Sequence, residues 1–278
     1  MKIFENRLNN LGVIIQKHEE VFNLVIENQK KKHKILPDEV FITLMLFRKI
    51  VERLDAIFIL IENKSENAAK SICRDLFENF LYFSYVVESN DKNKIRALSY
   101  YYSTLNDQIK LSKLLMSKNQ RGKKIRDFLN IKSDNVKLKE KTNRAATYFS
   151  NSTNGDAYAN IKIEWDRLIK NKVNYPNWYS LYKGPKSLRE LSLQCGYEVE
   201  YDLLYGIYSR QVHSSNVMDQ FENVNGLAGI KSLRRYEDPT LELIFSFSLG
   251  IESLRKLVDF FEINDEIKIG NWIKDEIK

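Results

Sequence analysis

The stretch from Tyr201 to Ser215, YDLLYGIYSRQVHSS, places His213 three residues after Arg210 and four after Ser209. Residues three and four apart share one face of a helix, so Tyr205, Ser209 and His213 would form a polar stripe. An imidazole exchanges a proton near neutral pH, and a guanidinium grips phosphate oxygens in a fork. Together these side chains are suited to acid–base chemistry at a phosphodiester.

A second pair of charges lies in the sequence CRDLFEN, where Arg74 and Glu78 are four residues apart in a helix whose other faces are expected to be buried. Two charges inside a buried helix are destabilising unless they are paired. They can pair with each other as a structural link, or they can meet the polar stripe across the bundle. In the second case Glu78 would orient His213, and Arg74 would hold an anion.

Other kinds of site have little support in the sequence. The histidines have no partner at HxxxH or ExxH spacing, so no metal site is expected. There is no glycine-rich phosphate loop and no GxSxG motif, and we expect no cofactor. Cys73 and Cys195 are far apart, without CxxC spacing or a nearby histidine, which is typical of a protein from a reducing cytoplasm.

The elements that must position these residues are helices, because apolar residues recur every three or four positions and no segment shows sustained alternation. With ten glycines and four prolines in 278 residues, the chain also has few of the turn residues that all-β folds need. The spacing predicts an all-α helical bundle. Its helices are expected at about 6–34, 38–62, 66–88, 92–116, 121–130, 134–149, 156–170, 187–195, 198–214, 240–261 and 265–278.

We expect a single domain over residues 1–278. Its core bundle would comprise about 38–116 and 198–261, and a helical insertion at about 120–190 would pack on one end. The segment 171–185 is interpreted as a loop with buried aromatic residues. The segment 215–237, with its small residues and its basic end, is interpreted as a mobile loop.

The formal charge of +7 is compatible with RNA as a partner. Two basic stretches, RGKKIRDF at 121–128 and KSLRRY at 231–236, are candidate phosphate contacts, although solvated helix faces have the same composition. The N-terminus lacks the order of a signal peptide, and the most apolar run, FITLMLF, is too short to span a bilayer. These features predict a cytoplasmic protein without a membrane partner.

Several of these residues resemble a known pattern: Arg74 and Glu78, then Trp178, then SLRELSLQCG, then the Tyr201, Tyr205, Ser209 and His213 series, with Ser215 after it. The series resembles an uncharacterised bacterial all-α family that has no established activity. More distantly, the chain is similar to the HEPN superfamily of helical nucleases and defence proteins. That superfamily has a longer spacing between arginine and histidine than the two residues separating Arg210 from His213.

Two functions follow from these observations. The HEPN likeness implies a metal-independent endoribonuclease of bacterial antiphage or toxin-type defence, with a homodimer and an operon-encoded protein as further partners. The alternative is a non-enzymatic helical module that binds a partner or acts as a scaffold, in which the same residues form a structural network. For the enzyme, the catalytic residues would be Arg74, Glu78, Arg210 and His213, supported by Tyr205, Ser209 and Ser215.

Overall fold

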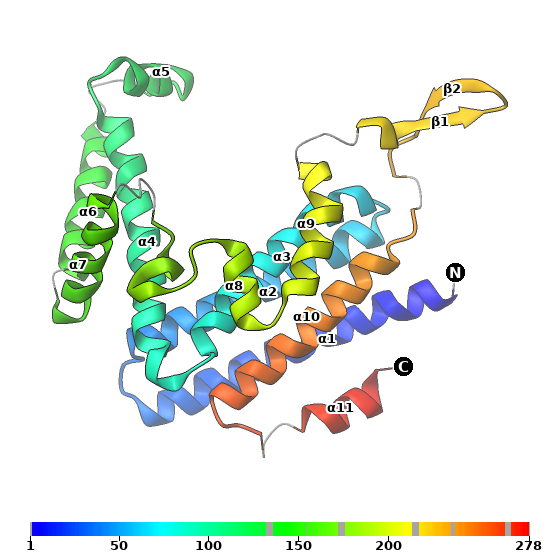
Figure 1. Ribbon diagram of the computed structural model, residues 1–278, viewed down its shortest axis with the longest axis horizontal. Coiled ribbons are helices and arrows are strands. Elements are labelled where there is room, and N and C mark those ends of the chain that lie inside the picture. The colour runs from blue at the N-terminus through cyan, green and yellow to red at the C-terminus, as the bar shows by residue number, and fades with distance from the viewer. Residues whose placement is uncertain are drawn as a thin grey trace. The chain divides into compact units, whose positions relative to one another are not determined.

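The computed structural model describes residues 2–131, 136–153, 155–171, 176–212, 217–234, 237–264 and 268–277. In these ranges the regular structure is helical apart from one two-stranded hairpin, so the predicted all-α class is confirmed (Figure 1). The contacts group the chain into two compact units, residues 1–93 with 188–278, and residues 94–187. The single domain with an insertion at about 120–190 stays a prediction; the second unit of this grouping begins earlier, at Lys94.

The first unit is built mainly from long helices whose bounds lie close to those predicted. Its elements are α1 (Lys2–Lys32), α2 (Asp38–Glu62), α3 (Glu66–Val87), α8 (Leu188–Cys195), α9 (Glu198–Val212), the 3-10 helix η2 (Val217–Gln220), β1 (Phe221–Val224), β2 (Leu227–Ile230), α10 (Thr240–Phe260) and α11 (Ile269–Glu276).

Helix α3 lies at the centre of the first unit and packs against α2, α8, α9 and α10. It is buried on several sides because its apolar residues are not confined to one stripe. Phe80, Leu81 and Phe83 are all fully buried, although these positions are spread over about 160° around the helix. Helix α3 is therefore the central helix of this unit, and its polar side chains, such as Arg74 and Asp75, lie at its contacts with neighbouring helices.

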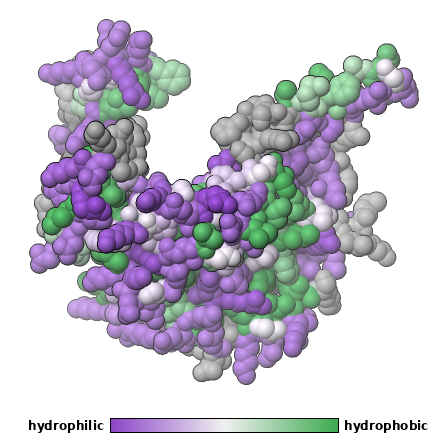
Figure 2. Space-filling view, in the orientation of Figure 1, coloured by the Kyte–Doolittle hydropathy of each residue, from purple (hydrophilic) through white to green (hydrophobic). Residues whose placement is uncertain are grey.

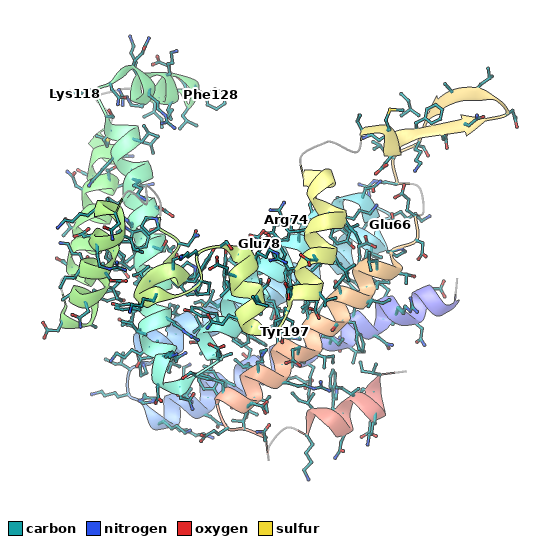
Figure 3. The ribbon with its side chains drawn as sticks, in the orientation of Figure 1. Glu66, Arg74, Glu78, Lys118, Phe128 and Tyr197 are labelled. Carbon is teal, nitrogen blue, oxygen red and sulfur yellow. The ribbon has the colours of Figure 1, made fainter. Side chains whose placement is uncertain are left out.

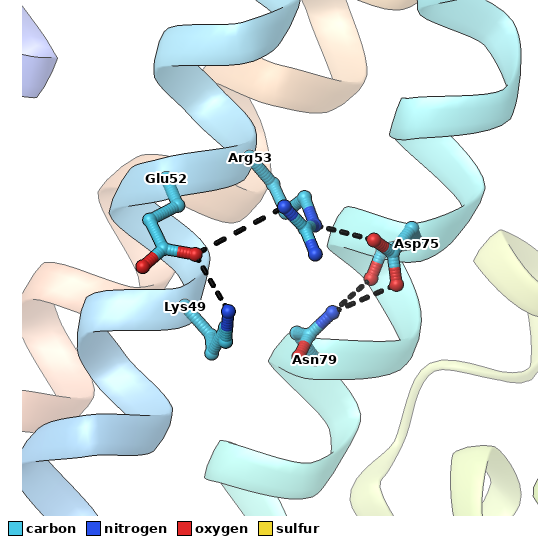
Figure 4. A network of polar contacts seen from close by, with 5 residues as sticks. All are labelled: Lys49, Glu52, Arg53, Asp75 and Asn79. Carbon is cyan, nitrogen blue, oxygen red and sulfur yellow. Dashed lines mark hydrogen bonds and ion pairs between the residues drawn. The ribbon is translucent and has the colours of Figure 1, made fainter. Parts of the chain in front are cut away.

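A network of polar side chains ties α2 to α3 (Figure 4). Arg53 on α2 forms an ion pair with Asp75 on α3, and Asn79 Nδ2 donates a hydrogen bond of 3.0 Å to Asp75 Oδ1. On α2, Lys49 Nζ donates to Glu52 Oε2 at 2.7 Å, and the same oxygen lies 4.0 Å from Arg53 Nη1. The network fixes one edge of α3 against α2.

A buried histidine joins α1 to α10 in the core. His18 is fully buried and stacks on Phe47, with ring centres 5.1 Å apart. Its Nδ1 lies 2.8 Å from the Ile14 carbonyl oxygen and its Nε2 lies 2.9 Å from Ser253 Oγ. Burial, only partly opposed by backbone hydrogen bonds, lowers the pKa of His18 to about 4. The ring is therefore neutral at pH 7, and this histidine is a core residue.

A hairpin occupies part of the segment for which the sequence predicts a mobile loop. Strands β1 and β2 pair antiparallel, with Phe221 opposite Ile230 and Val224 opposite Leu227. The turn between them is Asn225–Gly226, and both residues have positive φ, 54° and 85°, as a tight hairpin turn of this kind requires. The Asn-Gly pair is a hairpin signal in the sequence. The loop prediction for these ten residues is corrected accordingly.

The second unit comprises most of α4 (Asn90–Met116), α5 (Gln120–Phe128), α6 (Val136–Thr153), α7 (Asp156–Lys170) and the 3-10 helix η1 (Trp178–Lys183). Its core is aromatic. Tyr102 contacts Trp165 with ring centres 5.5 Å apart, and Tyr100 contacts Trp178 at 5.3 Å. The aromatic residues predicted to be buried in 171–185 include Trp178 and Tyr179, and both are buried; residues 172–175 lie outside the described ranges.

We expect the first unit to lose stability in acid through His18. In the unfolded chain its pKa is near 6.5 and in the folded chain it is about 4, so the unfolded state binds the proton first as the pH falls. The contribution of the neutral His18 ring to the free energy of unfolding is fully present above pH 6.5 and is lost as the pH falls towards 4. Between pH 7.5 and 4.5 the loss should be about 2.5 kcal/mol.

Urea unfolding at several pH values measures this loss. A His18→Gln protein should show a flatter pH dependence across this window, whereas His33→Gln, at an exposed position just after α1, should keep the wild-type dependence. An equally steep loss in wild type and His18→Gln would contradict the assignment.

Candidate functional site

The candidate site lies where α3 and α9 run antiparallel (Figure 3). The start of α9 meets the later part of α3, where the rings of Tyr197 and Phe80 pack edge to face with centres 4.9 Å apart. Further along α9, Tyr205 reaches Arg74, which is earlier in α3. The end of α9 therefore approaches the beginning of α3.

Arg74, Glu78 and Tyr205 form one cluster between these helices. Arg74 Nε donates a hydrogen bond of 3.3 Å to Glu78 Oε1, and the Tyr205 hydroxyl donates to the same oxygen. The guanidinium carbon of Arg74 lies 4.2 Å from the centre of the Tyr205 ring, in cation–π contact. On its other side Tyr205 stacks with Tyr201, with ring centres 4.4 Å apart. We call Arg74, Glu78 and Tyr205 the Arg74 cluster.

The protonation states in the Arg74 cluster are well defined. Burial and the hydrogen bond to Glu78 raise the pKa of Tyr205 well above its ordinary value, although Arg74 partly opposes them, so the hydroxyl stays protonated and donates. Burial lowers the pKa of Arg74, but contact with Tyr205 and Glu78 outweighs that effect and raises it overall. The cluster therefore holds a permanent cation against a neutral phenol.

The Arg74 cluster reaches solvent. The side chain of Arg74 is 20% exposed and that of Glu78 is 27% exposed. Arg74 and Glu78 each come one residue before the Asp75 and Asn79 of the α2 network, and so face α9 while their neighbours hold α2. A half-buried cation fixed in this way is able to contact an anion that approaches along α9.

The sequence-predicted site residues divide into three groups. Arg74, Glu78 and Tyr205 come together. Ser209 and Arg210 belong to helix α9, and only their helical backbone is described. The predicted acid–base residue, His213, and Ser215 lie outside the described residues, so their meeting with the Arg74 cluster stays a prediction.

Sequence reasoning did not find a second, deeper cluster on the same helix. The Tyr208 hydroxyl donates a hydrogen bond of 3.0 Å to Glu242 Oε1, and Glu242 is only 2% exposed. Cys73 lies beside this pair, with Sγ 3.9 Å from both Ser246 Oγ and the Glu242 carbonyl oxygen. Burial first, and then the charge of Glu242, raise the pKa values of Cys73 and Tyr208. The Cys73 thiol is therefore neutral and is not a nucleophile.

A cavity of about 360 Å³ lies at the beginning of α3, the end that α9 approaches. The positive end of the α3 dipole lies at Glu66, which lines the cavity. Lys231 is paired with Glu237 at 3.3 Å, whereas the other two lining cations, Lys64 and Arg234, have no ion pair with a described acid. Asp219 of η2 also lines it.

Membrane spans and metal clusters are both absent from the described ranges. No helix there combines the length and the apolar character that crossing a membrane requires. In the same part of the chain, no three His, Cys, Asp or Glu side chains gather as a metal site would need.

The two tyrosine–glutamate bonds of α9 should differ in their contribution to stability. Tyr208→Phe leaves a carboxylate without its donor in a dry interior, so we expect a loss of about 2 kcal/mol. Tyr205→Phe keeps the ring under Arg74, and water can reach Glu78, so we expect a loss of about 1 kcal/mol or less. Urea unfolding measures both values. Each variant removes one hydroxyl from the same helix, and a larger loss for Tyr205→Phe would contradict this ranking.

Comparison with known proteins gives one match. The model of a family of unknown function (DUF5677) matches residues 40–226, a range that includes α2, α3 and α9. Neither the curated proteins nor the solved structures gave a match to the chain.

Proposed function

Because the chain belongs to DUF5677, a family of unknown function, we propose a function from the chemistry of the α3–α9 pair: a metal-independent endoribonuclease of bacterial antiphage or toxin-type defence. The observation that carries the proposal is the Arg74 cluster. Glu78 and Tyr205 hold a half-buried guanidinium in place beside the helix that leads to His213. Such a fixed cation stabilises charge that develops on a phosphate without having to reorganise.

In the proposed reaction the ribose 2′-oxygen attacks the neighbouring phosphorus. A bond forms between the 2′-oxygen and phosphorus, and the bond from phosphorus to the 5′-oxygen breaks. If His213 takes the proton of the 2′-hydroxyl as a general base, solvent water gives a proton to the leaving 5′-oxygen; if His213 instead protonates that oxygen as a general acid, solvent water takes the 2′-proton. Arg74 balances the negative charge on the phosphorus oxygens, and Glu78 keeps Arg74 oriented.

The cavity at the start of α3 is a place where a phosphate of the RNA backbone would bind in the proposed nuclease. Its volume of about 360 Å³ falls in the range of small-molecule sites. Three lining cations are balanced by the carboxylates of Glu66, Asp219 and Glu237. A phosphate there would therefore be held by the two cations without a described ion pair, Lys64 and Arg234, and by the dipole at the N-terminus of α3. Asp219, which lines the cavity, comes six residues after His213 in the sequence.

Arg210 receives a lesser role in the proposal than Arg74. It is five residues after Tyr205, so its position on α9 is about 140° around the helix from the tyrosine that contacts Arg74. Positions so far apart lie on different faces of a helix. Arg210 would therefore contact a neighbouring phosphate, while Arg74 would act at the reacting one.

The second candidate is a non-enzymatic helical module. It is favoured by the fact that Glu78 accepts bonds from both Arg74 and Tyr205, so that the cluster satisfies itself and needs no ligand. In that case Arg74, Glu78, Ser209 and His213 would set how α9 packs on α3. Glu78→Gln and His213→Ala would then each lower the melting temperature sharply, and the wild type would cleave no RNA.

We expect labelled single-stranded RNA, incubated with the protein in the presence of a metal chelator, to be cleaved. His213→Ala should reduce the cleavage rate by about a hundredfold or more, because a positioned acid–base group is lost. Arg74→Ala should reduce it by a similar factor through lost charge stabilisation, and Arg210→Ala by less. Gel electrophoresis of the products measures the rates.

His33→Ala is the matched control, because His33 is an exposed histidine just after α1. Thermal unfolding shows whether each variant keeps its fold. Undiminished cleavage by folded His213→Ala would refute the assignment of the acid–base residue, and absence of cleavage by wild type would favour the helical module.

A further inference from the structure

Charge is distributed very unevenly between the two units. Residues 94–187 contain 20 Lys and Arg against 7 Asp and Glu, a net charge of +13. The remaining residues contain 24 Lys and Arg against 30 Asp and Glu, a net charge of −6. The modest +7 of the whole chain is thus the difference between a strongly basic unit and an acidic one. Such asymmetry indicates a polyanionic partner for the basic unit.

The basic charge of the second unit is concentrated around the short helix α5. Residues 118–128 contain five Lys and Arg against one Asp. Lys118, Arg121, Lys123 and Lys124 are all exposed, and none has an ion pair with a described acid. Elsewhere in this unit, Lys110 pairs with Asp107 and Arg167 with Glu164, at 3.1 and 2.7 Å. Hydrophilic residues cover most of α5 in the space-filling view (Figure 2).

Helix α5 is held firmly although it has only nine residues. Arg126 turns inward, and its Nη1 donates to the carbonyl oxygens of Leu115 and Ser117 at 2.6 and 2.7 Å. The Asn119 side chain caps the helix by accepting from Gly122 N at 2.8 Å. Gly122 packs so closely that a Cβ there would lie 2.5 Å from the Ser117 carbonyl oxygen. The cations of α5 are therefore presented on a fixed support.

An aromatic ring lies among these cations. Phe128 is 88% exposed, and Lys118 and Phe128 lie at either end of α5 (Figure 3). Phe128 follows Arg121 by seven residues and Lys124 by four, so the three positions share one helix face. Exposed aromatic rings between cations are the elements with which proteins bind single-stranded nucleic acid, by stacking on bases while the cations contact phosphates.

We propose that the α5 surface, formed by Lys118, Arg121, Lys124 and Phe128, binds single-stranded RNA. It would supply affinity for the substrate, and in that respect the inference rests on the proposed function. An anionic membrane fits less well. Interfacial helices separate an apolar face from a charged face, whereas Phe128 shares its face with Arg121 and Lys124.

The test uses a fluorescent 2′-O-methyl oligouridine of about a dozen nucleotides, which spans a site of the usual size and has no free 2′-hydroxyl to react. Binding is therefore measured on the intact protein whether or not it cleaves RNA. Fluorescence anisotropy at several salt concentrations should show that Arg121→Glu/Lys124→Glu weakens binding by about tenfold or more. A plot of the logarithm of the binding constant against the logarithm of the salt concentration should also become less steep, by about 1.4 in slope, because two phosphate contacts are lost. Phe128→Ala should weaken binding by about tenfold through lost stacking.

Matched controls lie on α7 of the same unit. Lys162→Glu/Lys170→Glu makes the same change of charge at exposed positions, and Ile163→Ala truncates a side chain that is 67% exposed. The affinity of these controls for the oligonucleotide should stay within about threefold of the wild-type affinity, a smaller change than the loss of one stacked base would cause. Equal losses in the α5 and α7 variants, or no loss in either, would overturn the proposal.

Phosphatidylserine–phosphatidylcholine vesicles form a separate arm. Binding to these vesicles without binding to the oligonucleotide would overturn the proposal in favour of a membrane surface. Cleavage is scored independently with unmodified RNA. If the wild type binds the oligonucleotide through α5 but does not cleave RNA, the proposed nuclease is contradicted and this inference is not. If Arg121→Glu/Lys124→Glu binds and cleaves as well as the wild type, this inference is contradicted and the nuclease is not.

Discussion

The structure depends on the need to pair charges on a helix that is buried on several sides. Helix α3 packs against four other helices and still carries Arg74 and Glu78. Both side chains are partly exposed, so leaving one of them without its partner would destabilise the fold only modestly. The pair is formed within the helix and is completed by Tyr205, which crosses from α9 to donate to Glu78 and to lie under Arg74. The position of α9 on α3 is thus linked to the satisfaction of these two charges.

Helix α9 makes the same bond twice in different surroundings. Tyr205 donates to a glutamate that reaches solvent, and Tyr208 donates to Glu242, which does not. The deeper bond sits beside a neutral Cys73 and gives α9 a fixed attachment to α10. With that attachment in place, the shallower bond is not required to hold the helix alone.

Much of the fold could be predicted because helical periodicity is strong in this sequence. The bounds of α2 and α3 agree with the prediction to within a residue. The spacing places Tyr205 on a polar stripe of its helix but leaves open whether that stripe meets the Arg74–Glu78 pair, because spacing within one helix does not say which helix packs against it. The Tyr208–Glu242 bond could not be predicted, because its partners are 34 residues apart and neither has a distinguishing pattern. The hairpin was missed because its strands have four residues each and are mostly exposed, so only the Asn-Gly turn indicated it.

The charge of each unit explains why affinity and chemistry would be separated in this protein. The unit that holds the Arg74 cluster is acidic overall, at −6, and would repel a polyanion that comes within about a Debye length of its surface. The basic unit, at +13, would concentrate RNA instead. In the proposed nuclease, phosphates would contact this unit at the start of α3, where Lys64 and Arg234 have no ion pair with a described acid and the helix N-terminus adds its dipole.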